Sequence, residues 1–257
     1  MILVYINKIE SASTLLTSAF QLANSLEKSF CVLYLVDNDS EIAVGTTAIE
    51  SVLDALKLKD SVKLIVQCGS IDDVHKVCET HEASFLFIQQ LAYNRKSIQQ
   101  SLTACRDLRI PYLIFKDSFA ALDLKTVIMP IGFLEEELEK AQFAAAFGRF
   151  CGSEVVMLLA NDYGSKAITN ARKMKTLFEK FSFNYRLEKG KADSFGIDKE
   201  GIALATELKS GVVIVTASRE YGLDDVIFGP KELHLVKKYD VPVLLINPRA
   251  DLYALCD

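Results

Sequence analysis

The fold is decided by the stretch from Val212 to Pro248, VVIVTASREYGLDDVIFGPKELHLVKKYDVPVLLINP. It begins with four β-branched apolar residues, Val212 to Val215, which are typical of a buried parallel strand. A loop with two glycines follows, and Pro230 then suits the start of a helix, because its φ is already helical and its missing N–H is not needed there. A second apolar run, Val243 to Ile246, predicts another buried strand.

The chain repeats this order of strands and helices. Ile2 to Ile6 (ILVYI) and Val127 to Ile131 (VIMPI) are predicted strands at an offset of 125 residues, and a helical apolar pattern follows each. The later predicted strands also match in pairs: Cys31 to Asp37 with Val155 to Asp162, Phe85 to Ile88 with Val212 to Val215, and Pro111 to Phe115 with Pro242 to Ile246. Strands that alternate with helices predict a parallel sheet with helices on both faces, here formed twice. We therefore expect two domains, at residues 1–118 and 125–249, joined by the segment from Asp117 to Leu124.

The composition is that of a globular protein. Of 257 residues, 50% are hydrophobic and 25% are charged. No apolar run is long enough to span a bilayer, and the start of the chain lacks a basic leader, so we expect a cytoplasmic protein without a membrane partner. A net charge of −5 offers no broad basic surface, so nucleic acid is not an expected partner.

The order of strand, glycine loop, helix and closing strand resembles the C-terminal signature of the universal stress protein family. In that family the strand leads to a glycine, two residues, a glycine, nine residues, and then glycine with serine or threonine; this loop holds ATP phosphates in the nucleotide-binding members. Aligned on Gly222 and Gly229, this chain has Thr216 and Arg219 at the first two glycine positions and Pro230 at the hydroxyl position. Pro230 has no N–H to donate to a phosphate. The resemblance implies an α/β fold of two tandem Rossmann-like (adenine nucleotide alpha hydrolase-like) domains, each a five-stranded parallel sheet with helices on both faces.

The residues after the first and fourth strands line the ligand crevice of an open parallel sheet. In the family that this chain resembles, nucleotide-binding members carry an aspartate directly after the first strand. Asn7 stands there in the first half, and Gly132, which follows Ile131, stands there in the second. No glycine lies between Gly69 and Gly132, so the first half lacks the residues of a backbone phosphate loop. The second half is therefore the better candidate for a site.

Two interpretations of the second-half loop stay open. In one, the Arg219 guanidinium holds an anion at the start of the helix, where Lys231 offers an N–H. In the other, Arg219 lies in water and the glycines serve only positive φ angles and helix packing. The candidate ligand-binding residues are Ile131, Gly132, Thr216, Arg219, Gly222, Gly229, Pro230 and Lys231.

The acidic residues near the crevice can be explained by structural roles. Asp37 and Asp162 follow the second strands, where they either face the crevice or end the strand. Asp198 is a candidate cap for the helix through Leu208. None of the three histidines sits at a predicted strand end. We therefore expect no catalytic residues.

Cysteine and histidine come closest to a metal pattern at Cys68, His75, Cys78 and His81. Their spacing fits no standard zinc template, and Cys78 falls on the apolar stripe of its helix, which favours a core position. We expect reduced cysteines and no metal.

The closing strands of the two halves are apolar and uncharged, so as open sheet edges they would invite association. Dimers of the family commonly form through this strand. We therefore expect an internal pseudo-dimer, or a homodimer, through Tyr112, Leu113, Ile114, Val243, Leu244 and Leu245.

Taken with the resemblance, these features predict a tandem universal stress protein, a cytoplasmic protein of the stress response. We expect it to bind a protein partner that the sequence does not identify and to take no cofactor. The altered loop argues against robust ATP binding. The alternative is an ATP-binding protein with slow hydrolysis in the second domain. The loop from Thr216 to Pro230 discriminates between the two.

Overall fold

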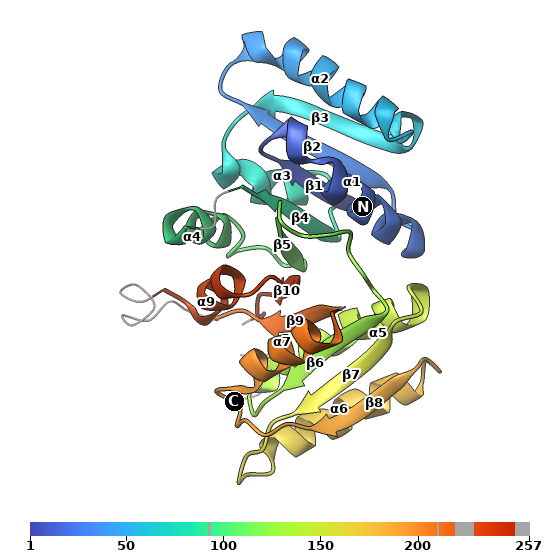
Figure 1. Ribbon diagram of the computed structural model, residues 1–257, viewed down its shortest axis with the longest axis vertical. Coiled ribbons are helices and arrows are strands. Elements are labelled where there is room, and N and C mark those ends of the chain that lie inside the picture. Colours follow the sequence, from blue (N-terminus) through green and yellow to red (C-terminus); the bar gives the residue numbers. More distant parts are fainter. Residues whose placement is uncertain (92–93, 210, 219–228, 250–257) are drawn as a thin grey trace. The chain divides into compact units, whose positions relative to one another are not determined.

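The computed structural model describes residues 1–91, 94–209, 211–218 and 229–249 (Figure 1). It divides into two compact units, Met1–Ala121 (unit 1) and Leu122–Asp257 (unit 2). The boundary falls inside the segment that the sequence analysis assigned to the connection.

Unit 1 is built on a parallel sheet in the order β3-β2-β1-β4-β5. Its strands are β1 (Ile2–Ile6), β2 (Phe30–Val36), β3 (Val62–Cys68), β4 (Phe85–Gln90) and β5 (Tyr112–Lys116). Its α-helices in the described residues are α1 (Ser13–Ser25), α2 (Ile42–Ala55), α3 (Val74–Thr80) and α4 (Arg95–Ala104).

Unit 2 repeats this order as β8-β7-β6-β9-β10, again with parallel pairs. Its strands are β6 (Thr126–Ile131), β7 (Glu154–Leu159), β8 (Tyr185–Lys189), β9 (Val212–Thr216) and β10 (Val243–Ile246). Its described α-helices are α5 (Lys140–Phe150), α6 (Lys166–Glu179), α7 (Ile197–Leu208) and α9 (Lys231–Lys238). The predicted α/β class, with five parallel strands in each half, is confirmed.

The core of each unit is the central part of its sheet. Every residue of β1 and β9 is buried, as their uninterrupted apolar runs predict for strands covered on both faces. In unit 2, α5 packs against α6, and Figure 1 shows α7 on the other side of the sheet, in front of β6. Small buried residues of α5, among them Ala141 and Ala144, allow this helix to lie close to the strands.

Two local expectations change in the structure. Strand β4 continues beyond Ile88 to Gln90, and both added glutamines are buried. Asp198 does not cap α7, because the helix begins one residue earlier, at Ile197, and Asp198 belongs to its first turn. The N-cap is Gly196, and the turn before it is held by Asp193, whose Oδ1 accepts the N–H groups of Phe195 and Gly196, both at 3.1 Å.

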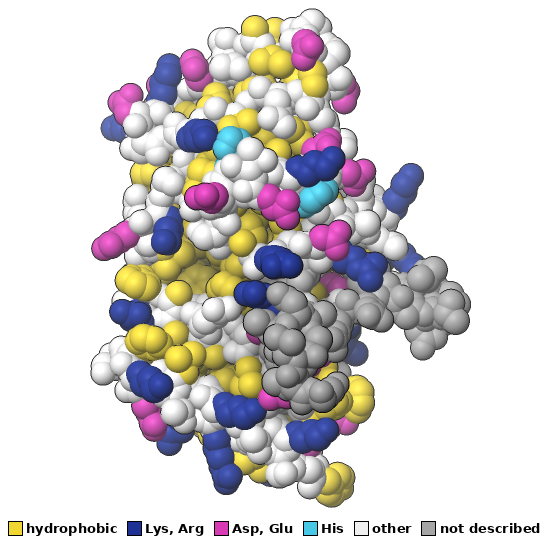
Figure 2. All heavy atoms as spheres, turned by 180° about the vertical axis from the view of Figure 1, so that it is seen from behind, with side chains coloured by type: hydrophobic (Ala, Val, Ile, Leu, Met, Phe, Trp, Pro, Cys, Tyr) yellow, Lys and Arg dark blue, Asp and Glu magenta, His cyan; other side chains and the backbone are white. Residues whose placement is uncertain are grey.

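The exposed surface mixes residue types. On the face shown in Figure 2, Lys and Arg side chains lie among Asp and Glu side chains, with hydrophobic side chains visible between them. Within the described ranges, no helix combines the length and the apolar character that crossing a membrane requires.

Candidate functional site

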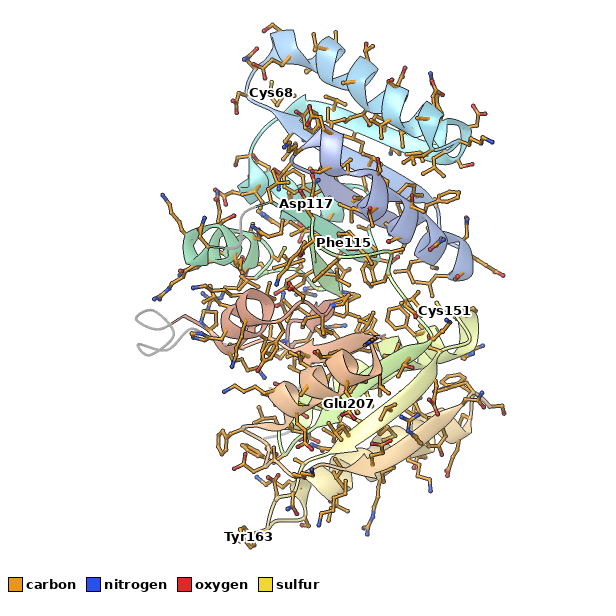
Figure 3. The ribbon with its side chains drawn as sticks, in the orientation of Figure 1. Cys68, Phe115, Asp117, Cys151, Tyr163 and Glu207 are labelled. Carbon is orange, nitrogen blue, oxygen red and sulfur yellow. The ribbon has the colours of Figure 1, made fainter. Side chains whose placement is uncertain are left out.

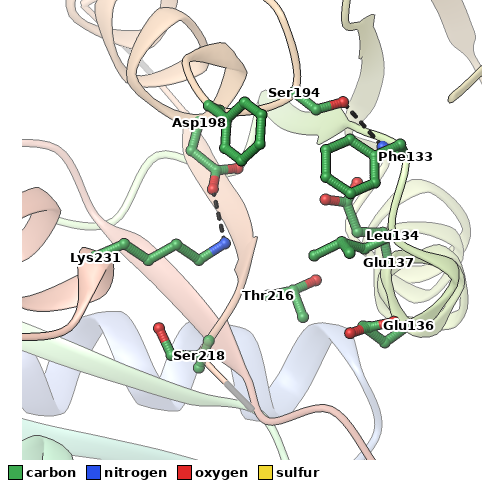
Figure 4. Close-up of a pocket in the computed structure, with 11 residues that line it drawn as sticks. Phe133, Leu134, Glu136, Glu137, Ser194, Asp198, Thr216, Ser218 and Lys231 are labelled. Carbon is green, nitrogen blue, oxygen red and sulfur yellow. Dashed lines mark hydrogen bonds and ion pairs between the residues drawn. The ribbon is translucent and has the colours of Figure 1, made fainter. Parts of the chain in front are cut away.

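A pocket of about 340 Å³ opens in unit 2 where the carboxyl ends of β6 and β9 meet (Figure 4). This is the end of a parallel sheet at which ligands bind in open α/β folds. The pocket is lined by Phe133, Leu134, Glu136, Glu137, Ser194, Phe195, Asp198, Thr216, Ala217, Ser218 and Lys231.

The backbone after β6 is held by a buried carboxylate. Glu137 is 5% exposed, and its Oε2 accepts the N–H of Gly132 at 2.5 Å. The same oxygen lies 3.5 Å from the Nζ of Lys140, a fully buried ammonium that also donates to the carbonyl oxygen of Pro130 at 2.5 Å. The Gly132 N–H, directly after β6, is therefore already hydrogen-bonded within the protein.

The structure gives a physical reason for glycine at position 132. A Cβ on Gly132 would lie 2.8 Å from Ser194 Oγ, closer than Cβ atoms approach other atoms, and at a tight 3.1 Å from Glu137 Oε1. Ser194 cannot easily yield, because its hydroxyl donates to Asp162 Oδ2 at 2.5 Å and accepts the N–H of Phe133 at 2.9 Å. The aspartate that the resemblance implies at this position for nucleotide binding would therefore require Ser194 to move. Asp162 thus has a structural role, because it accepts hydrogen bonds from Ser194.

The start of α9 is also filled by a side chain of the protein. Pro230 is the N-cap, and Glu232, two residues on, is 1% exposed. Its carboxylate accepts the Ser218 hydroxyl at 3.0 Å and the Ser218 N–H at 3.3 Å, as well as its own backbone N–H. Burial raises the pKa of Glu232, and these hydrogen bonds oppose the rise. A carboxylate therefore stands where a helix N-terminus would otherwise receive an external anion.

Lys231 brings a positive charge to the pocket wall. Its Nζ lies 3.1 Å from Asp198 Oδ2, and its side chain is 41% exposed (Figure 4). Burial lowers the pKa of Lys231, but the neighbouring carboxylates, Asp198 first, raise it by a larger amount. The net shift of this pKa is upward. The ammonium is therefore charged and already paired.

Thr216 and Lys231 are the two sequence-predicted residues that line the pocket, and Ile131 and Gly132 lie directly before Phe133 at its edge. Gly229 has a φ of +85°, the left-handed conformation that glycine adopts without strain. Arg219 and Gly222 fall outside the described residues, so both interpretations of that loop stay predictions.

Several lining residues escaped the sequence analysis. Phe133, Ser194 and Phe195 come from the loops after β6 and β8, and no spacing rule links these two loops. The order of strands in a parallel sheet was the available signal, because it places the loops after the first, third and fourth strands at one edge.

The corresponding place in unit 1 is bridged by one side chain. Gln89 at the end of β4 is fully buried, and its Oε1 accepts the N–H groups of Asn7 and Lys8, each at 2.8 Å. Its Nε2 donates to the carbonyl of Lys8 at 3.0 Å, and reaches Ser11 Oγ at 3.1 Å and Asp117 Oδ1 at 3.3 Å. Figure 3 labels Asp117, which directly follows β5.

The cysteine and histidine residues near α3 do not form a metal centre. Among the described residues, no group of three or more His, Cys, Asp or Glu side chains could hold a metal ion. Cys78 is 3% exposed, a core position as its helical stripe predicts, and burial raises the pKa of its thiol to about 12. His81 Nδ1 instead contacts Lys63 Nζ at 3.2 Å.

No family model matches this chain, and no curated protein matches its sequence. Solved structures do match its fold. A universal stress protein from Archaeoglobus fulgidus DSM 4304 aligns with a TM-score of 0.69 and 14% identity, over 96% of this chain and 98% of its own. A putative universal stress protein from Pseudomonas aeruginosa UCBPP-PA14 aligns with a TM-score of 0.62 and 14% identity, over 96% and 92%.

A functionally unknown protein from Pseudomonas aeruginosa PAO1 aligns with a TM-score of 0.58 and 13% identity, over 96% of this chain and 92% of its own. At 96% of this chain, each alignment extends over both units. Identities of this size carry information about the fold and not about ligands. The chain therefore has the fold of the universal stress proteins.

Proposed function

We propose that this chain is a tandem universal stress protein that works as a cytoplasmic regulatory binding protein of a stress response and does not depend on ATP. The observation that carries the proposal is the Glu232 carboxylate at the start of α9, which takes hydrogen-bond donors that a phosphate would need. The fold supports the family assignment, and the side chains of the crevice support a function that does not depend on a nucleotide.

A polyphosphate at this crevice would meet carboxylates. Glu232 stands at the helix start, Glu137 holds the Gly132 N–H, and Lys231 is bound to Asp198. Each contact that a nucleotide loses costs about 1–3 kcal/mol, so several lost contacts exceed what a micromolar site can spare. The anion site expected beside Arg219 stays a prediction, with Glu232 as its competitor, and sulfate soaks of crystals test it.

Calorimetry with ATP and magnesium tests this proposal. We expect a dissociation constant weaker than about 1 mM for the whole chain. Replacing Glu232 with alanine frees the helix N-terminus and should tighten ATP binding by about tenfold, whereas the same change at exposed Glu207 of α7 (Figure 3) should not. A low-micromolar constant for the unaltered chain would refute the proposal.

The second candidate function is ATP binding with slow hydrolysis in unit 2. Lys231 favours it, because its charged ammonium lines the pocket and is partly open to solvent. Under this alternative, Lys231→Met should abolish measurable ATP binding and hydrolysis. Under our main proposal that variant binds ATP no more weakly than the unaltered chain does.

We further propose that the closing strands, β5 and β10, pair with each other as an internal pseudo-dimer. Their apolar, uncharged sequences support this, since sheet edges of this kind need a cover. Residues 1–121 and 122–257, expressed separately, should each dimerise or precipitate. Slow amide hydrogen exchange at Leu113 and Leu244 in the whole chain supports the pairing, and fast exchange at both refutes it.

A further inference from the structure

We infer that the unit 2 pocket binds a small organic cation, in which an amidinium or ammonium group is attached to a planar apolar body. This inference deepens the proposed function and rests on it, because it needs the phosphate positions of the crevice to be closed. Three observations support it: the negative charge of Glu136, the buried Thr216 hydroxyl that has no partner among the described residues, and the exposed ring of Phe195.

The charge left in the pocket is negative. Glu137 forms an ion pair with Lys140 through Oε2, and the charges of Asp198 and Lys231 offset each other at 3.1 Å. The remaining lining carboxylate is Glu136, which is partly exposed and has no ion pair within the part of the chain that the structure describes. A carboxylate at a pocket wall attracts a cation and repels a phosphate or carboxylate.

Thr216 offers a hydrogen bond that the protein does not use. The residue is 3% exposed, and its Oγ1 has no hydrogen-bond partner among the described residues. Figure 4 shows it at the centre of the pocket, between Lys231 on one side and Leu134 on the other. A buried polar atom without a partner costs free energy, which a ligand N–H donating to this oxygen would recover.

An aromatic edge lies on the wall of the same pocket. The rings of Phe133 and Phe195 meet edge to face with centroids 5.6 Å apart, and Phe195 is 83% exposed. A planar group placed on these rings removes apolar surface from water, and a cationic group is also attracted to their faces. Phe133, Phe195, Leu134 and Ala217 thus accommodate the apolar body of the ligand, while Glu136 and Thr216 receive its nitrogen atoms.

The volume limits the ligand to a small molecule. At about 340 Å³ the pocket lies at the low end of the range for organic ligands. Benzamidine is a suitable probe, because it joins a flat ring to an amidinium that donates several N–H bonds. Benzamide has nearly the same shape without the charge, and benzoate has the opposite charge.

Calorimetry of the full chain with these three probes needs no variant. We expect benzamidine to bind about tenfold more tightly than benzamide, and benzoate not to bind. Equal binding of benzamidine and benzamide, binding of benzoate, or no saturable binding of benzamidine at millimolar concentration would each overturn the inference. Tight ATP binding in a parallel titration instead overturns the proposed function, so the two failures are distinguishable.

Variants locate the site. Glu136→Gln should weaken benzamidine about fivefold and leave benzamide unchanged, whereas Glu135→Gln, whose carboxylate pairs with Lys173 at 2.9 Å, should change neither. Thr216→Val keeps the side-chain shape, removes the hydroxyl, and should weaken benzamidine about fivefold or more. Benzamidine binding that both Glu136→Gln and Thr216→Val leave unchanged places the cation elsewhere and refutes the assignment.

Discussion

The two units differ most at the carboxyl ends of their first and fourth strands. The register of β1 with β4 matches that of β6 with β9, since Ile2 lies opposite Phe85 and Val127 opposite Val212. Counted from these pairs, Gln89 and Thr216 occupy the same place in the two sheets. Gln89 is long enough to bond the backbone after β1, whereas the Thr216 hydroxyl has no partner among the described residues and faces a pocket.

This difference shows that one side chain can decide whether a crevice of this fold is bridged or open. The backbone plan is shared, with the same strand order and parallel pairing. Unit 1 uses the Gln89 amide to tie the strand ends together, and unit 2 uses Glu137, Ser194 and Glu232 around a cavity. We therefore expect unit 2 to bind a ligand and the crevice of unit 1 to have a structural role.

The largest expected effect comes from giving unit 1 the residue of unit 2. Gln89→Thr removes a fully buried amide and leaves the N–H groups of Asn7 and Lys8 without this acceptor. We expect the free energy of unfolding to fall by about 3 kcal/mol, measured by urea denaturation. Gln100→Thr on the exposed face of α4 is the control and should cost less than about 1 kcal/mol. An equal loss at both positions would mean that the bridge adds nothing.

A side chain at Gly132 should have the next largest effect. Gly132→Ala places a Cβ 2.8 Å from Ser194 Oγ and should lower the free energy of unfolding by about 2 kcal/mol. Gly164→Ala is the matched control, because a Cβ there meets no atom within 4 Å. Thermal unfolding of both variants measures the difference. If Gly132→Ala is as stable as the control, steric exclusion does not explain the missing aspartate.

Removing the Thr216 hydroxyl, which has no partner among the described residues, should stabilise the chain. Thr216→Val keeps the shape of the side chain and suits a strand, so we expect a gain of about 1 kcal/mol in the absence of ligand. Thr176→Val removes a hydroxyl on α6 that donates to the Arg172 carbonyl at 3.0 Å, and it should give no gain. A destabilised Thr216→Val variant would show that the hydroxyl is satisfied in solution.

The smallest effect concerns pH and Glu232. Because the folded-state pKa of Glu232 is raised, the folded protein binds more protons than the unfolded chain between the ordinary value of 4.5 and that raised pKa. Its contribution to stability is therefore lost as pH rises through that window. Glu232→Gln should lack this decline, which urea denaturation at several pH values measures, with Glu207→Gln as the control for removing a charge. A variant that declines in parallel with the unaltered chain contradicts the shift.

Much of the fold could be predicted because its signals are local. The runs Ile2–Ile6 and Val243–Ile246 are strands with the expected bounds, since uninterrupted β-branched and apolar residues suit strands that are covered on both faces. The prediction that Asp198 caps α7 was wrong. The helix starts one residue earlier with Gly196 as its N-cap, and helix ends are hard to place to within one or two residues from sequence alone.

The sequence by itself determined the repeat, the parallel order of elements and the loss of phosphate-loop glycines, because each depends on residues that are neighbours along the chain. Tertiary structure alone decided that Glu232 stands at the helix start, that Ser194 excludes a side chain at Gly132, and that Gln89 bridges one crevice while Thr216 faces a pocket in the other. These contacts join residues from 14 positions apart, as for Ser218 and Glu232, to 82 positions apart, as for Asn7 and Gln89. These contacts depend on the length and direction of side chains where the carboxyl ends of several strands come together. No periodicity in the sequence shows which side chains meet there.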